Sequence, residues 1–195
     1  NFPEISVTVN LSWQKKDQQR YGKDDFHVTE QGVEIGNFEL VDTSEENVPP
    51  QVCLVMDHSG SMGGTNLEQA QKAVTSFIQT AGANMQTGLV VFDDTAETLC
   101  PVTESTGTVQ RAVDNVTADG GTNISAGLLQ GVNALENLSG NRIIILLSDG
   151  ADSGESAAAM PSVINQLTQK GIVVYAVGFD FADSAYLSQI CEATG

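Results

Sequence analysis

Two kinds of hydrophobic pattern divide the chain at a polar, acidic stretch, DTSEENVPP (42–50), whose closing proline pair stops regular structure. Before it, apolar and polar residues alternate in ISVTVNLSW (5–13), which predicts a strand with one wet face. Two further strands are predicted in FHVTEQGVEI (26–35) and NFELVD (37–42), with Gly32 and Gly36 as turn formers. We therefore expect a β-rich segment over residues 1–48, followed by a second domain.

Residues 49–195 alternate short apolar runs with amphipathic ones, which is typical of an α/β fold with parallel strands. Strands are predicted in VCLVMD (52–57), TGLVVFD (87–93), AETLCPV (96–102), RIIILLSD (142–149) and IVVYAVGF (172–179). Helices are predicted from about residue 66 onward and over residues 108–116, 125–138, 156–170 and 184–193. The first has Leu67, Ala70, Val74 and Ile78 along one face.

The strand AETLCPV follows its predecessor after a turn too short for a crossover, so it is expected to run antiparallel at the sheet edge. The predicted fold class is α/β: a central, mostly parallel sheet with one antiparallel edge strand and helices on both faces. The three strands before residue 48 cannot close a sandwich by themselves. We expect them to be part of a β-sandwich whose other strands are supplied from elsewhere.

Composition and charge argue against a nucleic-acid partner and against a membrane span. The chain has 195 residues, of which 41% are hydrophobic, and a formal net charge of −17. This charge repels phosphate backbones, so nucleic acid is not an expected partner. The longest clean apolar run is IIILL (143–147), which is far too short for a membrane span. Cys53, Cys100 and Cys191 lack metal-site spacing and are expected to be buried free thiols.

Polar residues gather where the strands are predicted to end. DHSGSMGG (57–64) follows the first strand of the second domain, LSDG (147–150) ends the fourth, and DGGTNIS (119–125) precedes a helix. In open α/β sheets the carboxyl ends of the strands form the ligand-binding edge. We therefore expect these three segments to converge.

The donor atoms in these segments favour a hard divalent cation. Ser59, Ser61 and Thr122 offer hydroxyls, and Asp57 and Asp149 offer carboxylates. Oxygen donors of this kind suit Mg²⁺, with Mn²⁺ or Ca²⁺ as alternatives. Two carboxylates only neutralise the ion, which would keep an open position for an anionic oxygen from outside.

DHSGSM, GGTN and LSDG, in this order within an α/β pattern, resemble the von Willebrand factor type A (VWA) domain and its metal-ion-dependent adhesion site. The resemblance covers residues 50–195 and implies a Rossmann-like fold. It implies that the three hydroxyls coordinate the ion directly, that Asp57 and Asp149 act mainly through bridging waters, and that a Glu or Asp of the ligand completes the shell. By the same resemblance, we expect residues 50–195 to lack the family's last strand and last helix. The β-rich start is similar to the segment before VWA domains of bacterial surface proteins.

The same residues are compatible with other interpretations. DHSGSMGG alone is also compatible with a capped helix start. A phosphate-binding loop lacks its GK[ST] ending, and a Ser-His-Asp hydrolase lacks the G-x-S-x-G turn, so we expect no enzyme. His58 is expected to be solvated. Asp119 and Asp152 flank the site, either as outer supports of the metal ligands or as solvated turn acids.

The sequence therefore predicts a metal-dependent adhesion or protein-binding module that captures a carboxylate offered by a protein or another surface ligand. The β-rich start and the acidic surface favour a secreted or cell-surface protein. The alternative is an intracellular VWA scaffold, or a subunit that works with an ATPase and has a structural role.

Overall fold

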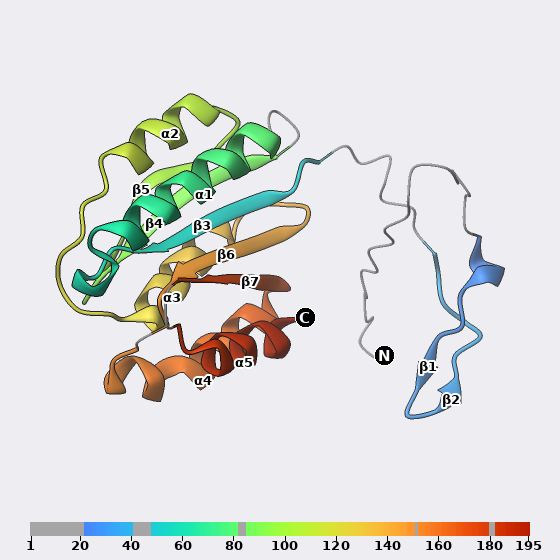
Figure 1. Cartoon of the computed structure of the whole chain (residues 1–195). Coiled ribbons are helices and arrows are strands. Elements are labelled where there is room, and N and C mark those ends of the chain that lie inside the picture. The colour runs from blue at the N-terminus through green and yellow to red at the C-terminus, as the bar shows by residue number, and fades with distance from the viewer. Residues whose placement is uncertain (1–21, 41–47, 82–84, 151, 180–181) are drawn as a thin grey trace. The chain divides into compact units, whose positions relative to one another are not determined.

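The computed structural model describes residues 22–40, 48–81, 85–150, 152–179 and 182–195. Its compact parts are two units, Asn1–Asn47 and Val48–Gly195, which are considered one at a time (Figure 1).

The described part of the first unit contains one short hairpin. Strands β1 (Thr29–Glu30) and β2 (Val33–Glu34) pair antiparallel, after a 3₁₀ turn at Lys23–Asp25. The single strand predicted over residues 26–35 is wrong, because Gln31 and Gly32 both take positive φ angles, 50° and 80°, and reverse the chain. Residues 37–40 form no strand, which contradicts that part of the prediction for NFELVD. ISVTVNLSW lies outside the described residues, and the β-sandwich stays a prediction.

The second unit contains a five-stranded sheet in the order β5-β4-β3-β6-β7. Its strands are β3 (Gln51–Asp57), β4 (Gln86–Phe92), β5 (Ala96–Thr103), β6 (Arg142–Ser148) and β7 (Ile172–Gly178). Its helices are α1 (Thr65–Ala81), α2 (Thr106–Asp114), α3 (Ile124–Leu135), α4 (Gly154–Gln169) and α5 (Ser184–Thr194), with a 3₁₀ turn η2 at Gly60–Met62. All neighbouring strands are parallel except β4 and β5, so the predicted fold class and the antiparallel edge strand are confirmed.

Helices cover both faces of this sheet, with α1 and α2 on one face and α3, α4 and α5 on the other (Figure 1). Every residue of the central strand β3 is buried. Because side chains alternate along a strand, Leu54 and Met56 enter the core under α1, whereas Val55 enters the core under α3. A strand that is buried on both faces reads as the continuous apolar run from which β3 was predicted.

Helix α3 packs against the sheet at two glycines. A Cβ atom at Gly127 would lie 2.5 Å from the Phe92 ring, and one at Gly131 would lie 2.9 Å from both Val55 and Ile144 side chains. Helix α3, which follows Thr122, therefore packs as closely against β3 and β4 as its backbone allows. This packing fixes the distance between the amino end of α3 and the sheet.

We expect Gly127→Ala to lower the free energy of unfolding by about 1–3 kcal/mol, because the added methyl group overpacks the buried Phe92. Gly107→Ala in α2 is the matched control, since its new Cβ has no atom within 4 Å. That control should be neutral or stabilising by up to about 1 kcal/mol, through helix propensity alone. Urea unfolding of both variants measures the difference, and equal effects would contradict the close packing of α3.

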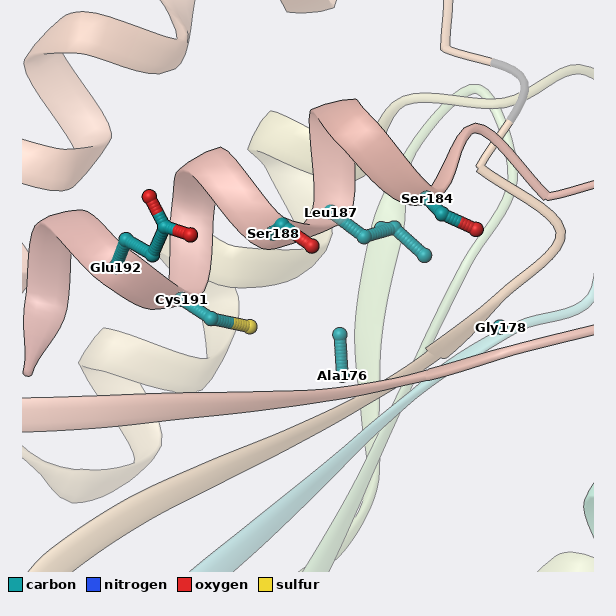
Figure 2. A pocket seen from close by; sticks show the side chains of 7 residues that line it. All are labelled: Ala176, Gly178, Ser184, Leu187, Ser188, Cys191 and Glu192. Atoms are coloured by element: carbon teal, nitrogen blue, oxygen red, sulfur yellow. The ribbon is translucent and has the colours of Figure 1, made fainter.

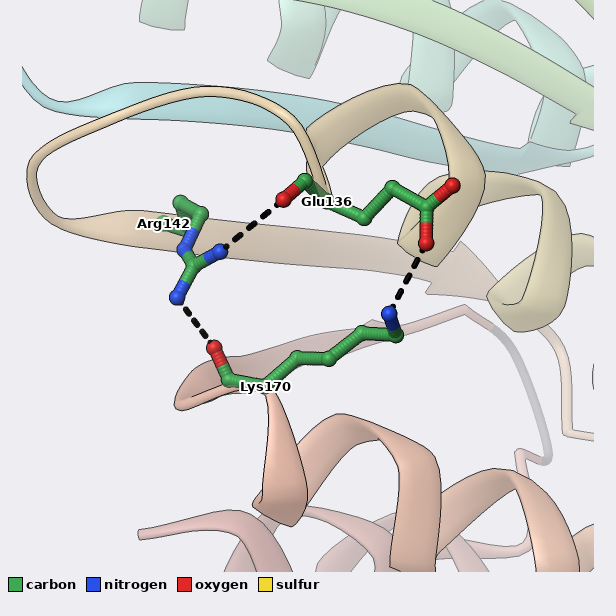
Figure 3. A network of polar contacts seen from close by, with 3 residues as sticks. All are labelled: Glu136, Arg142 and Lys170. Carbon is green, nitrogen blue, oxygen red and sulfur yellow. Dashed lines mark hydrogen bonds and ion pairs between the residues drawn. The ribbon is translucent and has the colours of Figure 1, made fainter.

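At the amino end of β6, three charged residues connect this strand to the ends of two helices (Figure 3). Arg142, which begins β6, donates to the backbone carbonyls of Glu136 and Lys170, the capping residues of α3 and α4. The Lys170 ammonium lies 2.8 Å from the Glu136 carboxylate. These contacts satisfy helix-end carbonyls that have no partner within their own helices.

The three cysteines are free, as predicted, with Cys53 and Cys100 buried and Cys191 half-buried. Burial raises the pKa of the Cys53 thiol to about 12, and it also raises the pKa of the other two thiols. Their thiolate populations at neutral pH are correspondingly small. No helix within the described residues is long and apolar enough to cross a membrane.

Candidate metal centre

Asp57 lies at the carboxyl ends of the parallel strands, the edge of the sheet where the polar segments were predicted to converge. Its side chain is fully buried at the end of β3. Its Oδ1 accepts a hydrogen bond from the Ser59 amide at 2.9 Å, and its Oδ2 accepts one from the Ser148 hydroxyl at 2.6 Å. The Ser148 Oγ in turn accepts from the Gly150 amide at 2.9 Å. One carboxylate therefore ties the end of β3 to the end of β6, which leads directly into Asp149.

The Asp57 carboxylate is buried without a Lys, Arg or His partner among the described residues. Burial raises its pKa, the hydrogen bonds from Ser148 and Ser59 oppose that rise, and the charge of Asp149 adds to it. No ion pair within the described residues involves Asp57. A buried carboxylate without a positive partner is costly. A bound divalent cation would remove that cost.

The Ser59 and Ser61 hydroxyls form a hydrogen bond to each other, and its length also suits two neighbouring ligands of one metal ion. Their Oγ atoms are 3.2 Å apart. Adjacent oxygen ligands of an octahedral ion bound at about 2.1 Å are about 3.0 Å apart, so both hydroxyls fit one Mg²⁺ shell. Ser59 is buried beside Asp57, whereas Ser61 is exposed on η2. Ser59 therefore lies in the buried part of this edge, and Ser61 lies in its solvent-exposed part.

Backbone hydrogen bonds bring the loop of Thr122 to the same edge. The Gly60 amide donates to the Gly120 carbonyl at 3.0 Å, and the Asp119 amide donates to the His58 carbonyl at 2.8 Å. On its other side, the Thr122 carbonyl accepts from the Ser153 amide at 3.1 Å. The three segments predicted to converge are thus connected to one another. Thr122 is half-buried within its loop.

The two flanking acids named from the sequence differ in what they contact. Asp119 accepts only from the amide of its own neighbour, Gly120, and is exposed, which fits a solvated turn acid. Asp152 accepts from the amides of Ile124 and Ser153 and from the Tyr186 hydroxyl. Asp152 therefore connects the amino ends of α3, α4 and α5.

Two polar residues of this edge had no role assigned from the sequence, although Ser148 belongs to the LSDG segment at the end of its strand. Ser148 supports Asp57, and Asp94 in the β4–β5 turn accepts from the Gly121 amide at 3.0 Å. Asp94 was taken only as part of a tight turn. The signal that marks it is spatial, because β4 lies beside β3 and its turn therefore reaches the glycine loop.

Three of the five predicted ligands are hydroxyls, so the candidate site contains no cluster of histidines, cysteines or acids. No group of three or more such residues suited to a metal occurs in the part of the chain that is described. His58 is directed to the Thr117 carbonyl, at 3.0 Å, instead of the hydroxyls.

A shallow hollow of about 260 Å³ lies between β7 and α5, with Ala176, Leu187 and Cys191 in its wall (Figure 2). None of the five predicted ligands lines it.

The α/β fold that carries these hydroxyls and carboxylates has known counterparts. The model of the von Willebrand factor type A domain matches residues 51–195. The chain belongs to the VWA family. The resemblance seen in DHSGSM, GGTN and LSDG is therefore confirmed, and VWA domains are chiefly modules that mediate protein binding.

Relatives of this VWA chain are larger proteins. It is 31% identical over 156 residues to calcium-activated chloride channel regulator 1 of Bos taurus, covering 74% of this chain but 16% of the relative. A von Willebrand factor type A structure from Catenulispora acidiphila has a TM-score of 0.66 at 22% identity, covering 75% of this chain and 37% of the other. The vWF domain of the type V pili tip protein Mfa5 from Porphyromonas gingivalis has a TM-score of 0.61 at 18% identity, covering 75% and 86%. These structures share the fold.

Proposed function

We propose that this VWA domain is a metal-dependent protein-binding module. Asp57, Ser59, Ser61, Thr122 and Asp149 would hold Mg²⁺, with Mn²⁺ or Ca²⁺ as alternatives, and the ion would take a carboxylate oxygen of the ligand. The observation that carries the proposal is the fully buried Asp57 carboxylate, which has no Lys, Arg or His partner among the described residues and lies beside Ser59, whose hydroxyl is 3.2 Å from that of Ser61.

The charge of the site explains why a carboxylate would be preferred. Asp57 and Asp149 together offset the charge of a divalent ion, and the other protein donors are neutral hydroxyls. An anionic oxygen at the remaining position therefore gains more than a neutral one. The chain as a whole carries a formal charge of −17, so long-range attraction of an acidic ligand is unfavourable. Attraction would come from the metal contact itself.

The setting of such a module would be the cell surface or the extracellular space. One structural relative is described as a pili tip protein, which supports a cell-surface setting for this domain too. We propose no catalytic step, because the five proposed ligands lack a nucleophile activated by a neighbouring base: His58 contacts the Thr117 carbonyl, not Ser59 or Ser61.

The proposal is tested with an array of paired peptides, in which each Glu or Asp sequence has a matched Gln or Asn partner. Peptides that bind in Mg²⁺ should lose binding in chelator, and their amide partners should bind at least about tenfold more weakly. Binding that survives the chelator, or that is equal for acid and amide, would refute the mechanism. Asp57→Asn on the protein side should abolish the acid preference.

A further inference from the structure

The loop that carries Thr122 is held on both sides by carboxylates that are not among the proposed ligands. Thr122 lies between Gly121 and Asn123, just before α3 begins at Ile124. Loop residues have no ladder or helix to hold their side chains in place. The position of the Thr122 hydroxyl therefore depends on the contacts made by the neighbouring backbone amides.

Asp94 holds the amino-terminal side of this loop. Its Oδ2 accepts from the Gly121 amide at 3.0 Å, and its backbone carbonyl accepts from the Asn123 side-chain amide at 3.4 Å. A Cβ atom at Gly121 would overlap the Asp94 carboxylate. The residue before Thr122 must therefore be glycine for the carboxylate to reach the amide.

Asp152 holds the carboxyl-terminal side. Its Oδ1 accepts from the Ile124 amide at 3.2 Å and from the Ser153 amide at 3.0 Å, while its Oδ2 accepts from the Tyr186 hydroxyl at 2.6 Å. The Ser153 amide also donates to the Thr122 carbonyl at 3.1 Å. Asp152 thus reaches Thr122 through both Ile124 and Ser153.

We propose that Asp94 and Asp152 are positioning residues that together hold Thr122 in the place where its hydroxyl binds the metal ion. This inference rests on the proposed function and deepens it, because it assigns the geometry of one ligand to two acids that do not themselves touch the ion. Residues that orient metal ligands in this way commonly change metal affinity by about 10–100-fold when replaced.

The test is calorimetric titration of the whole chain with Mg²⁺. Asp94→Ala and Asp152→Ala should each weaken Mg²⁺ binding about 10–100-fold. Asp94→Asn keeps an oxygen that accepts from the Gly121 amide and should restore affinity to within about threefold of the wild type. Glu97→Ala and Glu155→Ala are the controls, because each removes an exposed acid from a neighbouring segment and should leave affinity unchanged.

A second readout separates positioning from general destabilisation. In chelator, the exchange of the Gly121 amide hydrogen should accelerate in Asp94→Ala, and that of Ile124 in Asp152→Ala, while both variants unfold in one cooperative transition. Gly121→Ala should weaken Mg²⁺ binding as Asp94→Ala does, since the new methyl group displaces the same carboxylate.

The outcomes are distinguishable. If the wild type binds no Mg²⁺, the proposed function fails and this inference fails with it. If the wild type binds and both alanine variants bind equally well, only the inference is overturned. Equal losses in Asp94→Ala and Asp94→Asn would also overturn it, because charge and not the hydrogen bond to Gly121 would then be responsible.

Discussion

Asp57→Asn is expected to lower the affinity for Mg²⁺ by more than about 100-fold while the metal-free protein remains folded. The substitution removes the negative charge that compensates the ion. It preserves the shape of the side chain, whose oxygen can still accept from the Ser59 amide and whose amide can donate to the Ser148 hydroxyl. The loss should therefore fall on the metal and not on the fold.

The same variant should be more stable than the wild type in chelator at neutral pH. Because burial raises the folded-state pKa of Asp57, its contribution to stability is greatest below the ordinary pKa of an aspartate. That contribution is lost as the pH rises through the raised value. Asparagine does not ionise, so this decline should be absent from the variant, and its stability advantage over the wild type should grow as the pH rises.

Urea unfolding in chelator between about pH 4 and pH 8 measures this effect. Glu97→Gln, which neutralises an exposed acid on β5, is the control for the change in net charge. A metal-free Asp57→Asn protein that is less stable than the wild type at neutral pH would show that the Asp57 charge supports the fold without a metal.

Mg²⁺ at about a hundredfold excess over its dissociation constant is expected to stabilise the wild type by about 2.7 kcal/mol. For a protein of this size, that corresponds to a rise in melting temperature of roughly 5–10 °C. The reason is linkage: the ligating oxygens come from separate strands and loops, so the complete site exists only in the folded state.

Melting curves recorded in Mg²⁺ and in chelator measure the shift. Asp57→Asn is the control for a general effect of salt on a highly acidic protein. If the ion binds at the proposed site, the melting temperature of this variant should hardly rise in Mg²⁺. A shift of the same size in wild type and variant would place the stabilising ion elsewhere, and the five-residue site would be wrong.

Local patterns were sufficient for the elements of the VWA unit. Strands β3 and β4 were predictable because a strand buried on both faces needs a continuous apolar run. Helix ends moved by up to three residues: α3 ends at Leu135, not residue 138. In the first unit the turn predicted at Gly32 is confirmed, but residues 26–35 were predicted as one strand and form a two-stranded hairpin around that turn.

The sequence by itself determined the α/β class, the antiparallel edge strand and the five candidate ligands, because apolar periodicity and the order of polar motifs are local properties of the chain. Only the tertiary structure placed Asp94 against Gly121 and Asp152 against Ile124. These contacts join residues 27 and 28 positions apart, across strands whose order in the sheet differs from their order in the chain. The burial of Asp57 without a cation was likewise decided by packing, since a carboxylate at the end of a strand is solvated unless other elements cover it.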